Sequence, residues 1–397
     1  MRRDHDLTFA SLFSGCGGFD LGFIQSGFRC IGAFDIDPLA IQHHCQNLNT
    51  EAVVCDLSQE LPLARRTAPD VLLAGPPCQG FSLAGKRDHN DPRNKLLVLA
   101  AHAARKFRPL VLLVENVAGV RAGSHGRYWG ALHEIMRMAG YQTRDLVLIG
   151  SDWGVPQMRK RCLFLAWRTG RALPNELYGS PGGVLRDALR NLKDTANHTP
   201  KLIESSTRVG MIARRIKPGQ KLCNVRLGRR SVHTWQIPEV FGPTTKDERR
   251  LLELLVRTRR TYRTRSNGDA DPVLLSTMKS QGGPRTVELL ASLVSKGFVR
   301  KIGGRFDLAN TFNGKFRRLE WNRPSFTVDT RFGEPGYFLH PSENRGFTVR
   351  EAARIQGFPD SFCFFGDTRG QYRLIGNAVP PPMARSIAQI VKSALLG

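Results

Sequence analysis

The sequence predicts an α/β fold with a doubly wound, mostly parallel sheet and a second, smaller basic domain. Short apolar runs typical of buried strands recur through the first 170 residues, and helical patterns separate most of them. Glycine or acidic residues follow the ends of successive runs, which is where open α/β sheets bind ligands. The smaller domain is predicted from charge, because the middle of the chain is more basic than its flanks.

Net charge is the strongest compositional signal. The chain of 397 residues carries a formal net charge of +25 and has a pI near 10.5. Residues 186–320 hold 29 Lys and Arg against 12 Asp and Glu, so most of the excess lies in about a third of the chain. No lipid-facing amphipathic stretch accompanies this charge. It therefore favours a nucleic acid over a membrane as the partner.

Composition also excludes several classes of protein. The sequence has no apolar run of about eighteen residues, the length a membrane-spanning helix needs. The first residues, Met-Arg-Arg-Asp-His-Asp, lack an apolar signal core, which predicts a cytoplasmic protein. The eight cysteines include no Cys-x-x-Cys pair, so we expect reduced thiols and no metal site.

The first three predicted strands favour a bound nucleoside. Residues 8–12 are followed by the turn Phe13-Ser14-Gly15-Cys16-Gly17-Gly18 and by a helix that opens near Asp20. The strand at 30–34 ends in Asp35 and Ile36, about twenty positions beyond the turn, where a carboxylate can accept hydrogen bonds from ribose hydroxyls. A third strand, 52–55, ends in Asp56. A glycine turn alone is weak support for a nucleoside site. Three successive strands that each end in ligand-type residues favour such a site over ordinary turns that bind no ligand.

The next predicted strand, 71–74, breaks at Gly75-Pro76-Pro77 and presents Cys78. Two prolines remove backbone donors and fix the local path, which holds the thiol at the strand end. Most lone cysteines are buried and inert, so this pattern alone leaves a nucleophile and a packing residue as alternatives. The alternation then continues with predicted helices at 95–106 and 130–138 and predicted strands at 109–114, 146–149 and 161–167.

Periodicity weakens after about residue 170, where the basic region begins. We predict an α/β domain over 1–170, a basic domain over 171–320, and a return segment over 321–397 that completes the first domain near 370–397. Within the basic region, residues 246–310 form a pattern of helices at 246–260, 272–279 and 285–296 before a Gly-Gly hairpin. Two interpretations stay open, a winged helix that reads DNA and an ordinary insertion with a solvated basic face.

Dispersed motifs in a fixed order give the chain a strong resemblance to the DNA cytosine-5 methyltransferase family. They are Phe13-x-Gly-x-Gly-Gly18, Gly75-Pro-Pro-Cys-Gln-Gly-Phe-Ser82, Glu115-Asn-Val117, Gln157-x-Arg-x-Arg161, Arg350–Asp360 and Gly376-Asn-Ala-Val-Pro380. The resemblance covers residues 8–168 and 318–395 and leaves the basic middle as the variable region. It implies a Rossmann-like class I methyltransferase sheet.

The resemblance implies the following catalytic roles. Cys78 would add as a thiolate to carbon 6 of cytosine, which makes carbon 5 electron-rich. Glu115 would contact ring nitrogen 3 and the exocyclic amine. Arg159 and Arg161 would donate to the carbonyl oxygen, with Arg161 as the more direct contact. Asn116 and Gln157 are expected to hold their loops in place.

The resemblance also implies S-adenosylmethionine as the methyl donor. Phe13 would pack on the adenine side, Asp35 would take the ribose hydroxyls, and Asp56 would take the adenine amine. The family more often has Glu at the position of Asp35, so the shorter side chain raises the prospect of a water-mediated contact. The other expected cofactor-binding residues are Ser14, Gly15, Gly17, Gly18, Ile36, Leu57, Pro77, Leu96, Asn377 and Val379.

A cytosine inside a duplex must be flipped out before a thiolate can reach it. The segment 79–93 is the expected lid, and the DNA-binding residues expected in it are Gln79, Ser82, Lys86, Arg87 and Arg93. We expect a monomer acting on double-stranded DNA, either beside a separately acting restriction endonuclease or alone. The alternatives are a transfer-RNA cytosine-5 methyltransferase on the same scaffold and a catalytically silent DNA-binding regulator.

Overall fold

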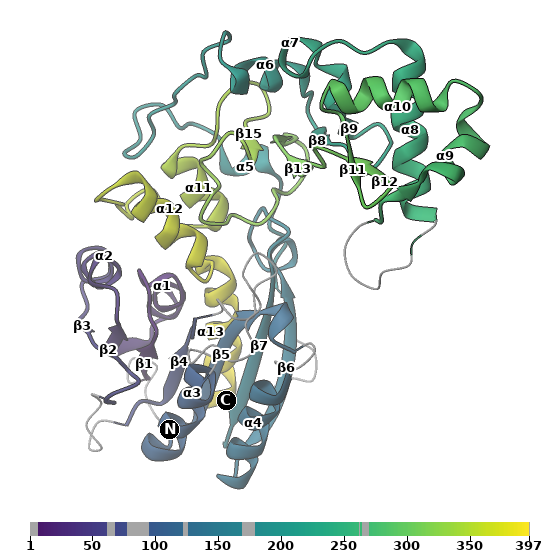
Figure 1. Ribbon diagram of the computed structural model, residues 1–397. Coiled ribbons are helices and arrows are strands. Elements are labelled where there is room, and N and C mark those ends of the chain that lie inside the picture. Colours follow the sequence, from purple (N-terminus) through teal and green to yellow (C-terminus); the bar gives the residue numbers. More distant parts are fainter. Residues whose placement is uncertain are drawn as a thin grey trace. The chain divides into compact units, whose positions relative to one another are not determined.

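The computed structural model describes residues 7–61, 68–77, 95–121, 126–168, 179–261, 263 and 270–396. The chain forms two compact units (Figure 1). Unit 1 comprises Met1–His198, Trp321–Arg331 and Thr348–Gly397, and unit 2 comprises Thr199–Glu320 and Phe332–Phe347. Residues 179–198 thus pack with unit 1 and Phe332–Phe347 with unit 2, whereas the boundaries predicted at 170 and 320 assign them otherwise.

Unit 1 alternates strands and helices as the sequence predicts. Its strands are β1 Thr8–Leu12, β2 Arg29–Asp35, β3 Ala52–Val54, β4 Val71–Ala74, β5 Val111–Val117, β6 Gln142–Ile149 and β7 Lys160–Trp167. Its helices are α1 Gly18–Gln25, α2 Pro38–Leu48, α3 Lys95–Phe107, α4 Gly126–Met138, α5 Leu185–Ala188, α11 Val349–Gln356, α12 Thr368–Asn377 and α13 Pro381–Leu396, with short 3-10 helices at Ala118–Arg121 and Gly150–Asp152.

The seven strands form one sheet in the order β3-β2-β1-β4-β5-β7-β6. Strands β1 to β5 pair in parallel, while β7 runs antiparallel to both β5 and β6. The central strands are continuous apolar runs, as a sheet covered on both faces requires. The prediction of a doubly wound, mostly parallel sheet is confirmed.

Two apolar cores cover the two faces of the sheet. On one face α3 and α4 pack against alternate residues of the central strands, with Leu72 and Leu112 fully buried. On the other face α1 and α13 cover the neighbouring set, which includes Leu73 and Leu113. A Cβ on Gly22 would lie 2.5 Å from the backbone of Arg385, so this close approach of α1 to α13 requires glycine.

Strand β5 is longer than the sequence predicts. The prediction places the strand at 109–114, with Glu115-Asn116-Val117 at its end. In the structure Glu115 and Asn116 stay in β5 and pair with Leu163 and Cys162 of β7. The polar side chains of this motif are therefore fixed by a central strand rather than by a loop.

Unit 2 contains short strands and a helical cluster. Its strands are β8 Lys221–Cys223, β9 Ser231–Val232, β10 Val273–Leu274, β11 Val299–Ile302, β12 Arg305–Leu308, β13 Asn313–Lys315, β14 Arg317–Arg318 and β15 Phe338–Leu339. Its helices are α6 Arg208–Arg215, α7 Pro238–Phe241, α8 Lys246–Thr261, α9 Leu275–Gly282 and α10 Thr286–Ser295, with a 3-10 helix at Thr234–Gln236. The helix predicted at 272–279 starts too early, since β10 pairs with β12 before α9 begins. Among the described residues, no helix combines the length and the apolar character that crossing a membrane needs.

Candidate functional site

The glycine turn after β1 has a left-handed backbone. Phe13 has φ 55°, and Gly15 and Gly17 have φ 56° and 90°. A Cβ on Gly17 would lie 2.8 Å from the ring of His44, and one on Gly18 would lie 2.3 Å from the carbonyl oxygen of Val379. The turn is thus pressed against α2 on one side and against the segment before α13 on the other, and it leads into α1 at Gly18.

A carboxylate from β2 holds this turn. Asp35 Oδ2 accepts from the backbone N–H of Gly15 at 2.9 Å, and its Oδ1 accepts from the N–H of Asp37 at 2.9 Å. Burial raises the pKa of Asp35 above its ordinary value. The next side chain, Ile36, is 65% exposed although it is large and apolar. Three residues of the predicted cofactor site, Gly15, Asp35 and Ile36, therefore lie at adjoining strand ends.

A buried polar network joins the elements on either side of the turn. Asp20 of α1 accepts from Ser11 Oγ at 3.0 Å and lies 3.0 Å from His44 Nε2. Both side chains of the Asp20–His44 pair are fully buried, and Thr50 contacts the other ring nitrogen of His44. Sequence motifs did not single out this network. The signal for it was an acidic residue in the first turn of the helix that follows the glycines.

The remaining predicted cofactor residues are placed in different environments. Asp56 is exposed, and its Oδ1 accepts from the N–H and hydroxyl of Ser58, which lowers the pKa of this carboxyl. Leu57 and Val379 are buried, while Asn377 is exposed at the end of α12. Pro77 and Leu96 are half-buried.

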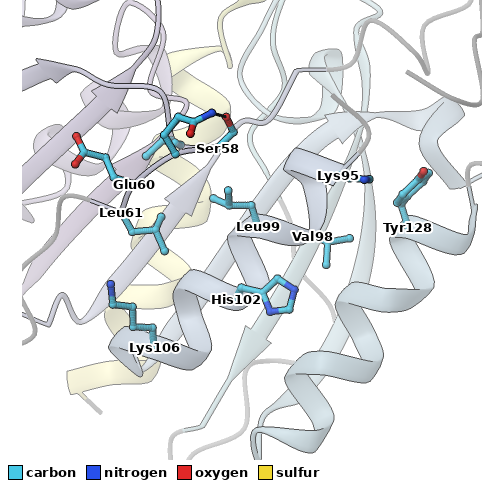
Figure 2. A pocket seen from close by; sticks show the side chains of 11 residues that line it. Ser58, Glu60, Leu61, Lys95, Val98, Leu99, His102, Lys106 and Tyr128 are labelled. Carbon is cyan, nitrogen blue, oxygen red and sulfur yellow. Dashed lines mark hydrogen bonds between the residues drawn. The ribbon is translucent and has the colours of Figure 1, made fainter. Parts of the chain in front are cut away.

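An open groove of about 590 Å³ lies beside Leu57 (Figure 2). It is lined by the loop after β3, by the outer face of α3 and by Tyr128 of α4. Leu57 is the one residue of the predicted cofactor set among its lining residues. We therefore do not assign this groove as the cofactor site, which the turn, Asp35 and Ile36 define better.

Glu115 and Arg161 form an ion pair at the ends of β5 and β7. Arg161 Nε lies 2.8 Å from Glu115 Oε1, and the two side chains are only 13% and 11% exposed. Glu115 Oε1 is buried against the Arg161 guanidinium, so the ion pair occupies this oxygen. The carboxylate as a whole has further acceptor capacity for an N–H donor.

Asn116 ties this strand end to the neighbouring motif. Its Nδ2 donates to the carbonyl oxygen of Pro76 at 3.2 Å, and its Oδ1 accepts from the N–H of Val117. The loop-holding role predicted for Asn116 agrees with these contacts. The contact links β5 to the segment that immediately precedes Cys78.

Gln157 and Arg159 join three segments that are far apart in the sequence. Gln157 donates to Gln356 Oε1 at 2.7 Å and accepts from the N–H of Val328 at 3.0 Å, as predicted for a residue that holds its loop. Arg159, 1% exposed, donates to the carbonyl oxygens of Val328, Gly376 and Ala378. These bonds hold the guanidinium against backbone. That placement differs from the predicted substrate contact for Arg159.

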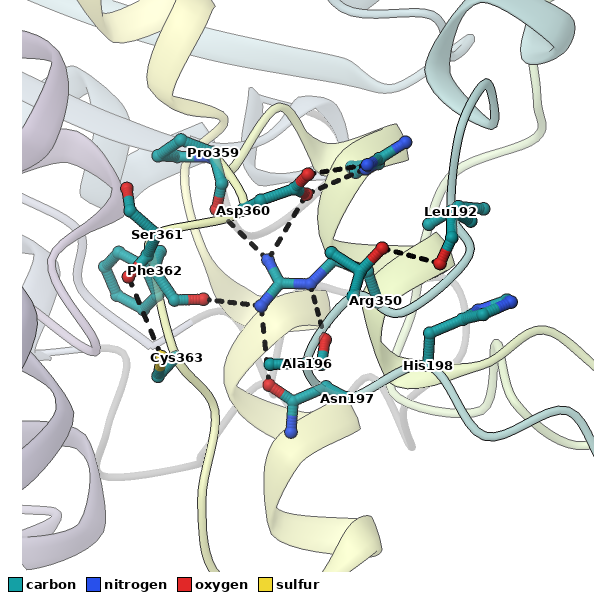
Figure 3. Close-up of polar contacts among 12 residues, drawn as sticks. Leu192, Ala196, Asn197, His198, Arg350, Pro359, Asp360, Ser361, Phe362 and Cys363 are labelled. Carbon is teal, nitrogen blue, oxygen red and sulfur yellow. Dashed lines mark hydrogen bonds and ion pairs between the residues drawn. The ribbon is translucent and has the colours of Figure 1, made fainter.

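A second buried arginine, Arg350 in the first turn of α11, bonds to the backbone of segments outside that helix (Figure 3). The Arg350 side chain is fully buried, and it donates to the carbonyl oxygens of Ala196, Pro359 and Phe362 at 2.9 to 3.1 Å. Removing this arginine would take the donor from three carbonyls, of which the one of Phe362 is buried. The arginine of this motif therefore supports the fold, and sequence reasoning missed that role.

Several predicted site residues lie outside the described residues. They are Cys78, Gln79, Ser82, Lys86, Arg87 and Arg93. Among the described residues, no group of His, Cys, Asp and Glu side chains is arranged to hold a metal ion. The described cysteines are free thiols, and burial raises the pKa of Cys16 and of Cys30 to about 12.

The strand order, the glycine turn after β1 and the carboxylate at the end of β2 define a class I methyltransferase fold. Comparison with solved structures agrees. A prophage-encoded DNA modification methyltransferase of E. coli has a TM-score of 0.60 and 23% identity, with 99% of this chain and 100% of that chain covered. The Dnmt2 methyltransferase of S. pombe has a TM-score of 0.53 and 16% identity, with 98% of each chain covered.

Comparison of sequences identifies the family. A model of the C-5 cytosine-specific DNA methylase family matches residues 7–393. The type II methyltransferase M.DdeI of Desulfomicrobium norvegicum is 29% identical, covering 96% of this chain and 88% of the relative. M.AgeI of Thalassovita gelatinovora is also 29% identical, covering 97% and 99%. The chain belongs to the C-5 cytosine-specific DNA methylase family, and its enzyme class is DNA cytosine-5 methyltransferase.

Proposed function

We propose that this enzyme methylates carbon 5 of a cytosine flipped out of duplex DNA, with S-adenosylmethionine as methyl donor and Cys78 as covalent nucleophile. The observation that supports this most is the Glu115–Arg161 pair, which places a carboxylate and a guanidinium side by side at the ends of β5 and β7. A carboxylate can accept from cytosine, because the exocyclic amine carries N–H groups and ring nitrogen 3 is protonated as the ring is attacked.

The residues around the glycine turn fit S-adenosylmethionine. The hydroxyl of Ser14 is buried and has no hydrogen-bond partner among the described residues. The Ile36 side chain is exposed at a strand end where a flat base could cover it. Asp35 would accept from the ribose hydroxyls, Asp56 and Leu57 would lie toward the adenine, and the sulfonium of the bound cofactor supplies an electrophilic methyl group.

The chemistry follows from the residues at the ends of β4, β5 and β7. The Cys78 thiolate adds to carbon 6 of the base and pushes electron density onto carbon 5. Glu115 hydrogen-bonds to nitrogen 3 and the amine, which draws electrons from the ring and distinguishes cytosine from thymine. Arg161 stabilises the negative charge that gathers on the carbonyl oxygen. After methylation a base takes the carbon-5 proton, and the electron pair of that C–H bond re-forms the double bond between carbons 5 and 6 and expels the Cys78 thiolate.

Arg159 takes a different role from the one predicted. Its three bonds to the backbone support a positioning role, because they hold the segments around Val328 and Ala378 behind the catalytic strand ends. We assign the contact with the carbonyl oxygen to Arg161 alone. The segment 376–379 that Arg159 holds includes Asn377 and Val379 of the expected cofactor pocket.

Recognition of DNA is proposed for unit 2 and for the segment 79–93. Unit 2 holds most of the basic excess of the sequence, which supports a polyanionic partner. Lys86, Arg87 and Arg93 would lie near phosphates when the lid closes on the flipped nucleotide.

Replacement of Cys78 by Ser tests the mechanism. The variant should lose methyl transfer to duplex DNA and keep its affinity for that DNA, because an alcohol is a far weaker nucleophile than a thiolate. A duplex carrying 5-fluorocytosine should form a covalent complex with the native enzyme and not with the variant. Methyl transfer by Cys78→Ser at the native rate would contradict the proposal.

A further inference from the structure

Part of unit 2 has the topology of a winged helix. The order along the chain is α8, β10, α9, α10, β11, β12, and the strands form an antiparallel sheet in the order β10-β12-β11. Apolar residues of all three helices and three strands share one core. In this arrangement α9 and α10 form a helix-turn-helix, and α10 occupies the position of the helix that normally enters the major groove.

The exposed face of α10 is poorly suited to read bases. Val287 and Val294 are 46% and 38% exposed, and Ala291 and Glu288 are also exposed. Readout of base edges in the major groove uses Arg, Lys, Asn, Gln, Ser or Thr donors, and the exposed part of α10 offers an acidic and apolar surface instead. A carboxylate at this position would also repel phosphates.

The basic residue at the start of α10 is already engaged. Arg285 lies 3.2 Å from Asp247 Oδ2 of α8 and 3.3 Å from Glu288 Oε1. Base contacts of a helix-turn-helix come chiefly from the N-terminal part of its second helix. At α10 this part presents a cation that two carboxylates partly neutralise, so the helix is not the electropositive element of the module.

The β11–β12 hairpin of the module, in contrast to α10, carries exposed basic side chains. Gly303 and Gly304 have φ of 52° and 78°, which gives the tight two-residue turn that matches strand twist. Ile302 and Arg305 flank this turn, Lys301 precedes Ile302, and all three side chains are exposed. Among the described residues, no carboxylate forms an ion pair with Lys301 or Arg305.

The hairpin is anchored to α8 by a buried ionic network. Arg259 of α8 and Asp307 of β12 are 4% and 5% exposed, and Arg259 Nε lies 2.5 Å from Asp307 Oδ1. Asp307 Oδ2 also accepts from Arg300 at 3.0 Å. Because Asp307 holds both arginines, the strands of the hairpin are fixed to the module. A fixed hairpin presents its tip at lower entropic cost than a mobile loop would.

We propose that this module contacts DNA through the tip of the β11–β12 hairpin, with Lys301 and Arg305 on the sugar-phosphate backbone, and that α10 does not read base edges. The inference rests on the proposed function, since it takes duplex DNA as the partner of unit 2. This assignment differs from that of most winged helices, in which the second helix of the helix-turn-helix supplies the main contacts with DNA.

The test is equilibrium binding of the full chain to duplex DNA across a series of salt concentrations, with S-adenosylhomocysteine present. The double variant Lys301→Ala/Arg305→Ala should bind about 10- to 100-fold more weakly, and its log–log salt slope should be shallower by about 2, as expected when two phosphate contacts are lost. The α10 double variant Val287→Ser/Val294→Ser should bind within about 2-fold of the native chain, since neither side chain should touch DNA. Both pairs are at the surface, so thermal melting should be unchanged.

A matched control removes the same charge elsewhere. Arg105 and Arg137 are exposed in the last turns of α3 and α4 of unit 1, outside the winged-helix module, so Arg105→Ala/Arg137→Ala should leave the salt slope nearly unchanged. A hairpin variant with native affinity and slope would overturn the inference while native methylation of DNA leaves the proposed function standing. A native chain that binds no duplex would overturn both.

Discussion

Arg161 of β7 lies 2.8 Å from Glu115 of β5, and the two side chains form a nearly buried ion pair where these two strands meet. Antiparallel pairing of β5 with β7 fixes both backbones, so the carboxylate and the guanidinium are placed before any substrate arrives. A preorganised pair of this kind need not reorganise when charge develops on a base. The pair is central to the proposed mechanism.

Replacing Glu115 by Gln should lower kcat about 10²- to 10⁴-fold, because the amide cannot accept and share protons with the base as a carboxylate does. Affinity for S-adenosylmethionine should be unchanged. Single-turnover methylation and cofactor titration measure the two effects separately. Glu134→Gln, an exposed change on α4, is the control. Loss of cofactor binding in Glu115→Gln would indicate a structural role instead.

Arg159 and Arg161 should respond differently to substitution by Ala. Arg159→Ala leaves the buried carbonyl groups of Val328 and Gly376 without this donor and should destabilise unit 1 by about 3 kcal/mol. Arg161→Ala removes the partner of Glu115, so it should also lower stability, and in addition it should lower kcat at least about 10²-fold. Thermal unfolding and rate measurements on both variants check this. An Arg159→Ala variant as stable as the native chain would contradict the assignment of Arg159 as a positioning residue.

Asp35 should make cofactor affinity depend on pH. Burial raises the pKa of this carboxyl, and only the ionised form can accept from both the turn and the ribose. Affinity for S-adenosylmethionine should therefore fall as pH drops, beginning above the pH at which an ordinary Asp is protonated. The same raised pKa means that protonating Asp35 favours the folded state, so this residue should not contribute to acid unfolding.

Isothermal titration from pH 5 to pH 8 measures this dependence. Asp35→Asn should bind weakly at every pH and lose the dependence. Asp56→Asn makes a matched comparison at an exposed carboxyl, and it should weaken binding less because its contacts to Ser58 lie in solvent. An unchanged pH profile in Asp35→Asn would contradict the role of Asp35.

Glu248 should control the acid stability of unit 2. Burial opposes its charge, but hydrogen bonds from Lys296, Ser292 and the N–H of Thr245 outweigh burial and lower its pKa to about 2. A carboxyl with a depressed pKa stabilises the fold above the unfolded-state pKa, which is about 4.3, and this stability is lost as pH falls toward 2. Glu248→Gln should lower stability by about 1–3 kcal/mol at pH 7.

The difference between native chain and Glu248→Gln should shrink between about pH 4.3 and pH 2. Urea unfolding followed by a probe in unit 2, at several pH values, measures it. Glu253→Gln on the same helix is a control for the loss of charge alone. A difference that stays constant down to pH 2 would show that ionisation of Glu248 does not stabilise the unit.

Periodicity and motif order were sufficient to predict the sheet and the grouping of Asp35 with the glycine turn. They were not sufficient where contacts between distant segments determine the length of a strand or the partner of a side chain. The predicted strand stops at residue 114, yet pairing with β7 extends it through Glu115 and Asn116. Arg159 and Arg161 are two positions apart in one motif, and only the fold shows that the first binds backbone carbonyls while the second meets Glu115.

Long-range polar contacts were also beyond sequence reasoning. The Asp20–His44 pair and the bonds of Arg350 join residues that no local pattern connects. The winged-helix pattern of residues 246–310 was visible in the sequence, but the exposed face of α10 and the anchoring of Asp307 depend on packing.

The most direct test of the account is transfer of a labelled methyl group from S-adenosylmethionine to unmethylated genomic DNA, with structured RNA assayed in parallel. Product analysis then identifies the modified atom, and sequencing locates it. The account predicts label in DNA alone, at carbon 5 of cytosine within one short sequence, and none with Cys78→Ser. Label in RNA alone, or methylation of DNA that survives the loss of Cys78, would contradict it.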